Sequence, residues 1–164
     1  MNLLIIGAGG HGKVVKEVAE ATGDFDKIDF VDDNSSEAVG EIADIERLRT
    51  AYDAAFVGIG NNHFRGELLT KLEDCEYHIP TLIHPTAYVS KTAEIAKGTV
   101  VEPKAIVNAN SVVGEGCIIS VGSIVDHDVV LERCVHVNAG AICKAGAVVN
   151  AEIKLEAGQV VKGY

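Results

Sequence analysis

Tryptophan is absent from the 164 residues, and Phe and Tyr occur only four times each. The apolar 48% of the chain is therefore mostly Val, Ile, Leu and Ala, which favours regular strands over an aromatic-rich binding surface. Basic residues are also few, and the formal charge is −10. Nucleic acid and anionic membranes require basic patches, so this charge argues against both as main partners. A small anionic ligand stays possible, because backbone amides and single cations can hold it.

Long apolar runs are missing as well. The apolar run before Gly7 is only four residues, Leu3–Ile6, and no basic segment stands before it. No stretch approaches the roughly 18 apolar residues of a membrane-spanning helix. We therefore expect no membrane span and a cytoplasmic location. The four cysteines have no CxxC spacing, which favours buried free thiols over metal ligation, and we expect no metal.

Residues 1 to about 80 alternate between strand and helix patterns. Short apolar runs predict buried parallel strands, and segments with helical spacing of apolar residues separate them. This order predicts a Rossmann-like α/β half domain over residues 1–82, with helices on the faces of a small parallel sheet. The expected strands are Asn2–Ile6, Lys27–Val31, Ala54–Ile59 and Tyr77–Ile83, and the expected helices are Gly12–Thr22, Ile45–Ala51 and Phe64–Glu73.

The second half follows a period of six. From Ala87 to Tyr164 the chain divides into thirteen hexads without a break, and the third position is always Val, Ile, Leu or once Cys. Such a repeat predicts a solenoid with three flat faces per turn, in which each hexad is a short strand plus a corner. The third residue points inward, and the small residues at the first position fit the tight corners. We predict a β-helix over residues 83–164.

The second position of the hexad should point outward, yet it is mostly apolar. Outward apolar stripes need a cover, and a closed ring of copies covers two different faces of each copy. The repeat therefore predicts an oligomer, although it does not give the number of copies. One face carries Tyr88, Ile106, Ile124, Ile142 and Val160, the next Glu94, Val112, Val130 and Val148, and the third Val100, Ile118, His136 and Lys154.

The hexads resemble those of the left-handed β-helix acyltransferases. The whole chain is similar to the branch that contains sialic acid O-acetyltransferases and UDP-4-amino-sugar N-acetyltransferases. This resemblance implies a left-handed β-helix, a homotrimer and acetyl-CoA as the donor. The motifs that carry it are Gly7–Gly12, Asp32-Asp33, Gly60-Asn61-Asn62 with Arg65, Ile83-His84-Pro85, and Val125–Asp128 followed by His136.

His127 is the best candidate for a catalytic residue. It stands at the fifth position of its hexad, near a corner, where a side chain can face a groove between copies. Acetyl transfer to an amine or hydroxyl needs a base, and imidazole has a suitable pKa. Asp126 and Asp128 flank it, and the resemblance implies that Asp128 assists. The alternative is a solvated histidine with ordinary acidic neighbours.

His136 interrupts a largely apolar row nine residues later. The resemblance implies that His136 contacts the donor near the thioester carbonyl, and that a backbone amide near Gly146 helps to stabilise the oxyanion. The alternative is a polar residue at a subunit seam.

Gly7, Gly9 and Gly12 fit a GxGxxG turn, and Asp32 follows at the distance of a ribose-binding acid. Alone, this pattern indicates NAD, but half a dinucleotide fold suits a mononucleotide or nucleotide-sugar better. The resemblance implies that this domain binds the acceptor. Gly9, Gly10 and the helix start would face phosphates or sugar, His11 the sugar, and Asp32 and Asp33 the nucleoside. Tight strand–helix packing is the alternative reason for the glycines.

Gly60, Asn61, Asn62 and Arg65 follow another expected strand, at the end where parallel sheets bind ligands. Arg65 could pair with an anionic group, whereas Asn62 could equally belong to a capping turn. His84, before Pro85, is read either as part of a structural hinge or as a wall of the site.

The sequence thus predicts an acetyl-CoA-dependent N-acetyltransferase of a UDP-linked 4-amino sugar. O-acetylation of sialic acid or a related sugar is the alternative within the same class. Only 28 residues follow His136, fewer than in related enzymes, so the donor could be held weakly. This motivates a second hypothesis, a non-catalytic nucleotide-sugar-binding trimer. An NAD-binding regulator is the third.

Overall fold

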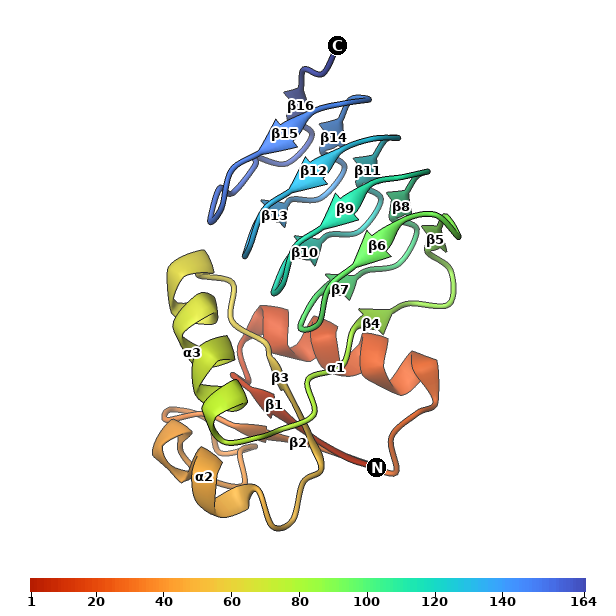
Figure 1. Cartoon of the computed structure of the whole chain (residues 1–164). Helices are drawn as coiled ribbons and strands as arrows, with labels where there is room; N and C mark the ends of the chain where they lie inside the picture. Colours follow the sequence, from red (N-terminus) through yellow and green to blue (C-terminus); the bar gives the residue numbers. More distant parts are fainter. The chain divides into compact units, whose positions relative to one another are not determined.

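The computed structural model describes residues 1–164, which form two compact units, Met1–Pro80 and Thr81–Tyr164. The first unit is built on a parallel sheet of three strands in the order β2-β1-β3 (Figure 1). Its strands are β1 (Asn2–Ile6), β2 (Lys27–Val31) and β3 (Ala54–Val57), and its helices are α1 (Gly10–Thr22), the 3-10 turn η1 (Ile42–Asp44), α2 (Ile45–Leu48) and α3 (Asn62–Asp74).

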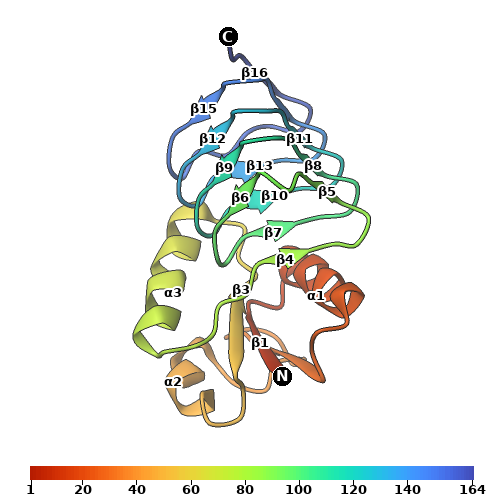
Figure 2. The ribbon, with the colours of Figure 1, turned by 45° about the vertical axis from the view of Figure 1, so that its right-hand side comes forward.

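Helices cover both faces of this sheet. Leu4 and Ile6 of β1 pack in one apolar cluster with residues of α2 and α3, such as Leu69. Neighbouring strand residues point to opposite faces, so the equally buried Leu3 and Ile5 face the other side. In Figure 2, α1 lies on one side of the strands and α2 and α3 lie on the other. This confirms the predicted α/β arrangement of the first unit.

The second unit is a prism of stacked coils with three parallel sheets as its faces (Figure 1). Each strand has two residues and pairs with the strand 18 residues further on, as Ile118 does with His136. We call the sheets the first, second and third face. The first face holds β4 (Leu82–Ile83), β7 (Val100–Val101), β10 (Ile118–Ile119) and β13 (His136–Val137). The second holds β5 (Tyr88–Val89), β8 (Ile106–Val107), β11 (Ile124–Val125), β14 (Ile142–Cys143) and β16 (Val160–Val161), and the third holds β6 (Glu94–Ile95), β9 (Val112–Val113), β12 (Val130–Leu131) and β15 (Val148–Val149).

The interior of the prism is made by the third residue of each hexad. Val101, Val107 and Val113 are almost fully buried and share one core cluster with their counterparts in later coils. On the third face the second residues point outward into solvent, and Val112, Val130 and Val148 are 42%, 38% and 59% exposed. On the first face the second residues Val100 and Ile118 are buried. The six-residue register and the three faces read from the sequence are confirmed.

The fourth strand expected in the first unit, Tyr77–Ile83, is wrong. His78 makes only an isolated bridge to Ala54, whereas Leu82 and Ile83 pair with β7 in the prism. The residues from Thr81 to Thr86 form one more hexad, with Ile83 at its third position. The chain therefore divides after Pro80, and the last two residues of the expected first domain belong to the second unit.

None of the helices has the length and the apolar composition that a membrane-spanning helix requires.

Adjacent valines of β9 provide a matched test of this interior. Val113→Ala removes two buried methyl groups and leaves a cavity, so the free energy of unfolding should fall by about 2 kcal/mol. Val112→Ala makes the same change on the outer side, and a single chain should lose less than about 0.5 kcal/mol. Denaturant unfolding at several protein concentrations measures both. Equal losses at the lowest concentration would contradict the inward direction of Val113.

Candidate active site

The corner Asp126–Asp128 joins β11 on the second face to β12 on the third. Asp128 has a φ of 57°, in the left-handed region, and Asn110 in the coil before it has a φ of 59°. Short Asn and Asp side chains tolerate this conformation better than most others. The tight corner turns the side chains of His127 and Asp128 outward, where each is 45% exposed.

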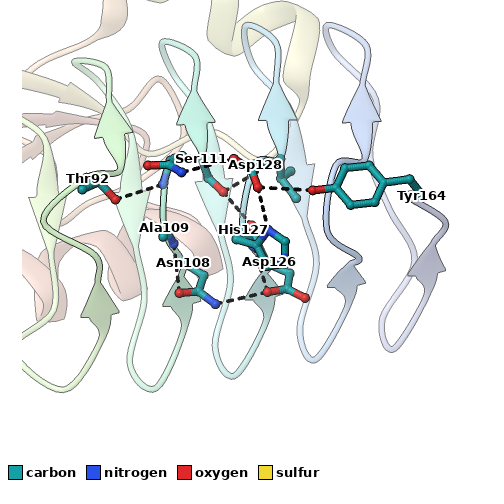
Figure 3. A network of polar contacts seen from close by, with 10 residues as sticks. Thr92, Asn108, Ala109, Ser111, Asp126, His127, Asp128 and Tyr164 are labelled. Atoms are coloured by element: carbon teal, nitrogen blue, oxygen red, sulfur yellow. Dashed lines mark hydrogen bonds and ion pairs between the residues drawn. The ribbon is translucent and has the colours of Figure 1, made fainter.

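His127 and Asp128 form a hydrogen-bonded pair (Figure 3). The distance from His127 Nδ1 to Asp128 Oδ2 is 2.6 Å. An ionised carboxylate only accepts, so the imidazole proton is on Nδ1 and the lone pair is on Nε2, which has no partner within the chain. The hydrogen bond to Asp128 raises the pKa of His127 above its usual 6.5. This is the arrangement of a general base held in one tautomer by a carboxylate.

Asp126 orients the backbone of the corner rather than the imidazole ring. Its Oδ1 accepts from the His127 N–H at 2.8 Å and from Asn108 Nδ2 at 3.1 Å. These two bonds, that from His127 first, lower the pKa of Asp126. Ser111 Oγ also donates to the Asp126 carbonyl at 2.6 Å, beneath the corner (Figure 3). Of the two flanking acids, only Asp128 therefore contacts the ring.

Gly146 is already engaged. Its N–H, expected near the thioester oxygen, donates to the His127 carbonyl at 3.0 Å in the stacking of the coils. The preceding N–H, that of Ala145, has no hydrogen-bond partner within the chain. At the equivalent place in other corners, the side chains of Asn108 and Asp126 satisfy this amide, whereas Ala145 follows Lys144, which has no acceptor.

His136 lies on β13 of the first face, where its Nε2 is 3.0 Å from Ser120 Oγ. His127 lies at the corner between the other two faces, so a single chain does not place the two imidazoles side by side. His84 bonds to the side chain and N–H of Thr86, which makes it part of a local turn.

In the first unit, the glycines after β1 fall into two kinds. A Cβ at Gly12 would lie 2.0 Å from the Gly7 carbonyl oxygen, and Gly7 itself has a φ of 103°. Both are therefore required by the packing of α1 on the sheet. A Cβ at Gly9, Gly10 or Gly60 would meet nothing within 4 Å, and none of the three has a positive φ. The chain itself gives no reason for glycine there, whereas a ligand that approaches the backbone would.

The start of α1 is also open to a ligand. Gly9 is its N-cap and supplies no side chain, and no acidic residue stands in the first turn. By contrast, Asn61 caps α3, accepting from the Phe64 N–H at 2.9 Å. The start of α1, which no side chain caps, is suited to an anion such as a phosphate.

Asp32 and Asp33 follow β2 at the same edge of the sheet and hold backbone in place. Asp32 accepts from the N–H groups of Ala8 and Asn34, both at 2.8 Å, and these bonds lower its pKa. Asp33 accepts from the Ile42 N–H at 2.8 Å. Both aspartates thus shape the loops around the glycine turn, and the sequence motif alone did not reveal this role.

Asn61, Asn62 and Arg65 stand where β3 passes into α3. Arg65 is only 1% exposed, and its guanidinium donates to Asn62 Oδ1 at 2.8 Å and to the Ile59 carbonyl at 3.0 Å. Arg65 thus holds the loop that carries Gly60, whereas the sequence suggested that it pairs with an anionic group.

Burial and the nearby Arg65 charge lower the pKa of His11 to about 4, so its imidazole is neutral near pH 7. The three strand ends bring all the predicted acceptor residues to one edge of the sheet.

Sequence reasoning missed two partners of Asp128. Asn110 Nδ2 donates to its Oδ1 at 3.3 Å, and Tyr164 Oη donates to its Oδ2 at 3.2 Å. They stand 18 residues before and 36 residues after Asp128, which is one and two coils. The 18-residue register was the signal that could have found both.

Comparison with known proteins relates the chain to sugar acetyltransferases. Residues 2–72 match the model of the PglD N-terminal domain. The chain is 37% identical over 108 residues to UDP-N-acetylbacillosamine N-acetyltransferase of Bacillus subtilis, an alignment that covers 60% of this chain and half the length of that relative.

Solved structures of related proteins match over 99% of the chain. The acetyltransferase domain of PglB from Neisseria gonorrhoeae, in complex with acetyl coenzyme A, is 35% identical, with a TM-score of 0.94 and 82% of that chain covered. A histidine-to-asparagine mutant of perosamine N-acetyltransferase from Caulobacter crescentus, in complex with CoA and GDP-perosamine, is 28% identical, with a TM-score of 0.91 and 89% covered.

The fold is thus a Rossmann-like α/β unit followed by a left-handed parallel β-helix. The sequence patterns predicted the two parts, and the resemblance implied the left hand. The chain belongs to the family of hexapeptide-repeat sugar acetyltransferases.

Proposed function

We propose that this protein transfers the acetyl group of acetyl-CoA to the amine of a nucleotide-linked 4-amino sugar. The observation that carries the proposal is the His127–Asp128 pair, whose free Nε2 faces outward at a corner of the β-helix. It is supported by the names of two relatives, a UDP-N-acetylbacillosamine N-acetyltransferase and a perosamine N-acetyltransferase, and by related structures that hold acetyl coenzyme A, or CoA with GDP-perosamine. Acetyl-CoA and nucleotide sugars are cytoplasmic metabolites, so we place the reaction in the cytoplasm.

In this mechanism, the sugar amine attacks the thioester carbonyl while His127 Nε2 removes its proton. The negative charge of Asp128, 2.6 Å from Nδ1, stabilises the imidazolium that forms. The tetrahedral intermediate then collapses and expels the CoA thiolate, which takes up the proton from His127. Positioned proton transfer of this kind contributes about 10²–10⁴-fold to rate.

The oxyanion needs hydrogen-bond donors aimed at its position. The Gly146 N–H cannot serve, because it is a backbone donor fixed on the His127 carbonyl, and the Ala145 N–H replaces it in our proposal. His136 is the second donor, and its side chain would exchange Ser120 Oγ for the thioester oxygen. Because it lies on a face away from His127, we infer that it reaches the same thioester from a neighbouring copy. The exposed valines of the third face supply apolar area for that contact, and we propose a homotrimer as the closed ring.

Mixed oligomers test this shared site. His127→Ala and His136→Ala chains should each be nearly inactive on their own. When the two chains are mixed and exchange subunits, about one quarter of the sites should become active. These are the sites at which the chain that supplies His127 and the chain that supplies His136 each carry that histidine. The acetyl-transfer rate before and after exchange is the measurement. A rate that stays at the sum of the two separate variants would show that both residues serve within one chain, or that no ring forms.

The acceptor would bind at the sheet edge of the first unit. Its phosphates are suited to the uncapped start of α1, where Gly9 and Gly10 leave space for close approach. Asp32 and Asp33 follow β2 at the same sheet edge, where they could contact the nucleoside while they hold their loops.

Product analysis separates this proposal from its rivals. Nucleotide-linked 4-amino sugars and free sialic acids are offered in turn with acetyl-CoA, and mass spectrometry locates the acetyl group. Acetylation of the amine supports the proposal, and acetylation of a sialic acid hydroxyl supports the alternative. Binding of the nucleotide sugar without transfer to any acceptor would support a non-catalytic binding protein.

A further inference from the structure

Tyr164 reaches the catalytic corner from two coils away. Its Oη donates to Asp128 Oδ2 at 3.2 Å, the same oxygen that receives His127 Nδ1 at 2.6 Å. The Tyr164 and His127 rings lie 6.4 Å apart between centroids. Figure 3 shows the phenol pointing along the stack of coils toward Asp128.

Gly146 makes this reach possible. Asp128, Gly146 and Tyr164 occupy the same corner position in three successive coils, each about 5 Å from the next. The tyrosine ring lies across the middle one, because a Cβ at Gly146 would be 1.9 Å from Tyr164 Cε1. Equivalent left-handed corners elsewhere carry Asn110, Asp128, Cys134 and Glu152, so the backbone alone does not demand glycine. The overlying ring does.

We propose that Tyr164 is a positioning residue for acetyl transfer, which holds the Asp128 carboxylate in the orientation that receives His127 and limits how strongly it attracts the imidazole proton. Asn110 holds the other oxygen at 3.3 Å, so the carboxylate is fixed from both sides along the stack. The role in catalysis rests on the proposed function, whereas the hydrogen-bond geometry does not.

The direction of the effect follows from the shared oxygen. A carboxylate oxygen that accepts two hydrogen bonds is a weaker acceptor for each, so loss of the phenol strengthens its attraction for the imidazolium. The pKa of His127 should then rise further. The other charged group that acts on His127 is Asp126, beside it, and it stays unchanged in the variant.

Tyr164→Phe tests the proposal, because it removes only the hydroxyl. NMR titration of the His127 ring, assigned by its loss in His127→Ala, should show the pKa rising by about half a pH unit. The acid limb of kcat/KM should move by the same amount, and kcat should fall about threefold, with KM for acetyl-CoA nearly unchanged. Gly146→Ala, which displaces the ring, should give the same NMR shift.

Tyr88→Phe is the control, since Tyr88 is exposed on β5 and makes no side-chain hydrogen bond; it should leave the His127 titration unchanged. An unchanged His127 titration in Tyr164→Phe would overturn the positioning role. A shifted titration in a chain that never transfers acetyl would instead keep the contact and refute the proposed function.

Discussion

His127→Ala should lower kcat for acetyl transfer by at least about 10²-fold, with KM for both substrates changed little. The reason is that Nε2 is the one nitrogen of the His127–Asp128 pair that can accept the proton of the amine. Since the side chain is half-exposed and makes no core contact, the fold should persist. Steady-state kinetics with acetyl-CoA and a nucleotide-linked 4-amino sugar measure the effect.

His78→Ala is a suitable control for this variant. His78 is exposed and pairs through its backbone with β3 at Ala54, at the amino end of the strand and away from the predicted acceptor residues. It should keep the wild-type kcat. If His127→Ala transfers acetyl at the wild-type rate, the general base has been misassigned.

Gly10 and Gly12, both in the first turn of α1, should respond to alanine in opposite ways. Gly12→Ala places a methyl group 2.0 Å from the Gly7 carbonyl oxygen. Because this oxygen belongs to the backbone, it cannot move away as a flexible side chain could. We expect a loss of about 3 kcal/mol in the free energy of unfolding. Gly10→Ala meets nothing within 4 Å in the first turn of α1, so stability should stay the same or rise by about 0.5 kcal/mol.

Gly10→Ala should nevertheless weaken acceptor binding by tenfold or more, because its methyl group would occupy the space that we assign to the phosphates. Isothermal titration with the nucleotide sugar measures affinity, and thermal unfolding measures stability in the same samples. Wild-type affinity in Gly10→Ala would remove the glycine turn from the acceptor site. A stable Gly12→Ala would contradict the close approach of α1 to the sheet.

The β-helix was predictable because its interior repeats every six residues. One buried aliphatic at each third position, such as Val107 or Val125, places every strand and assigns it to a face. The first hexad, Thr81–Thr86, was not recognised because its Leu82 and Ile83 read equally well as the end of an α/β strand. A two-residue strand has no periodicity of its own and depends on its neighbour in the stack.

The site was only partly predictable. Residue type and spacing pointed to His127 and Asp128, but not to the use of individual atoms. The Gly146 N–H donates to the His127 carbonyl, whereas the Ala145 N–H has no partner in the chain, and this depends on which amide of each corner points along the stack of coils. The burial of Arg65 and the loop-holding bonds of Asp32 are likewise tertiary features with no local signal.

The pH dependence of kcat/KM tests the central claim, that neutral His127 takes the proton of the amine, most directly. A base must be unprotonated, and Asp128 raises the pKa of His127 above 6.5, so the rate should fall tenfold per pH unit below that raised pKa. In a His127→Asn chain the residual rate should lose this limb, apart from any contribution of the substrate amine. A flat profile in the wild type, or the same limb in both chains, would contradict the account.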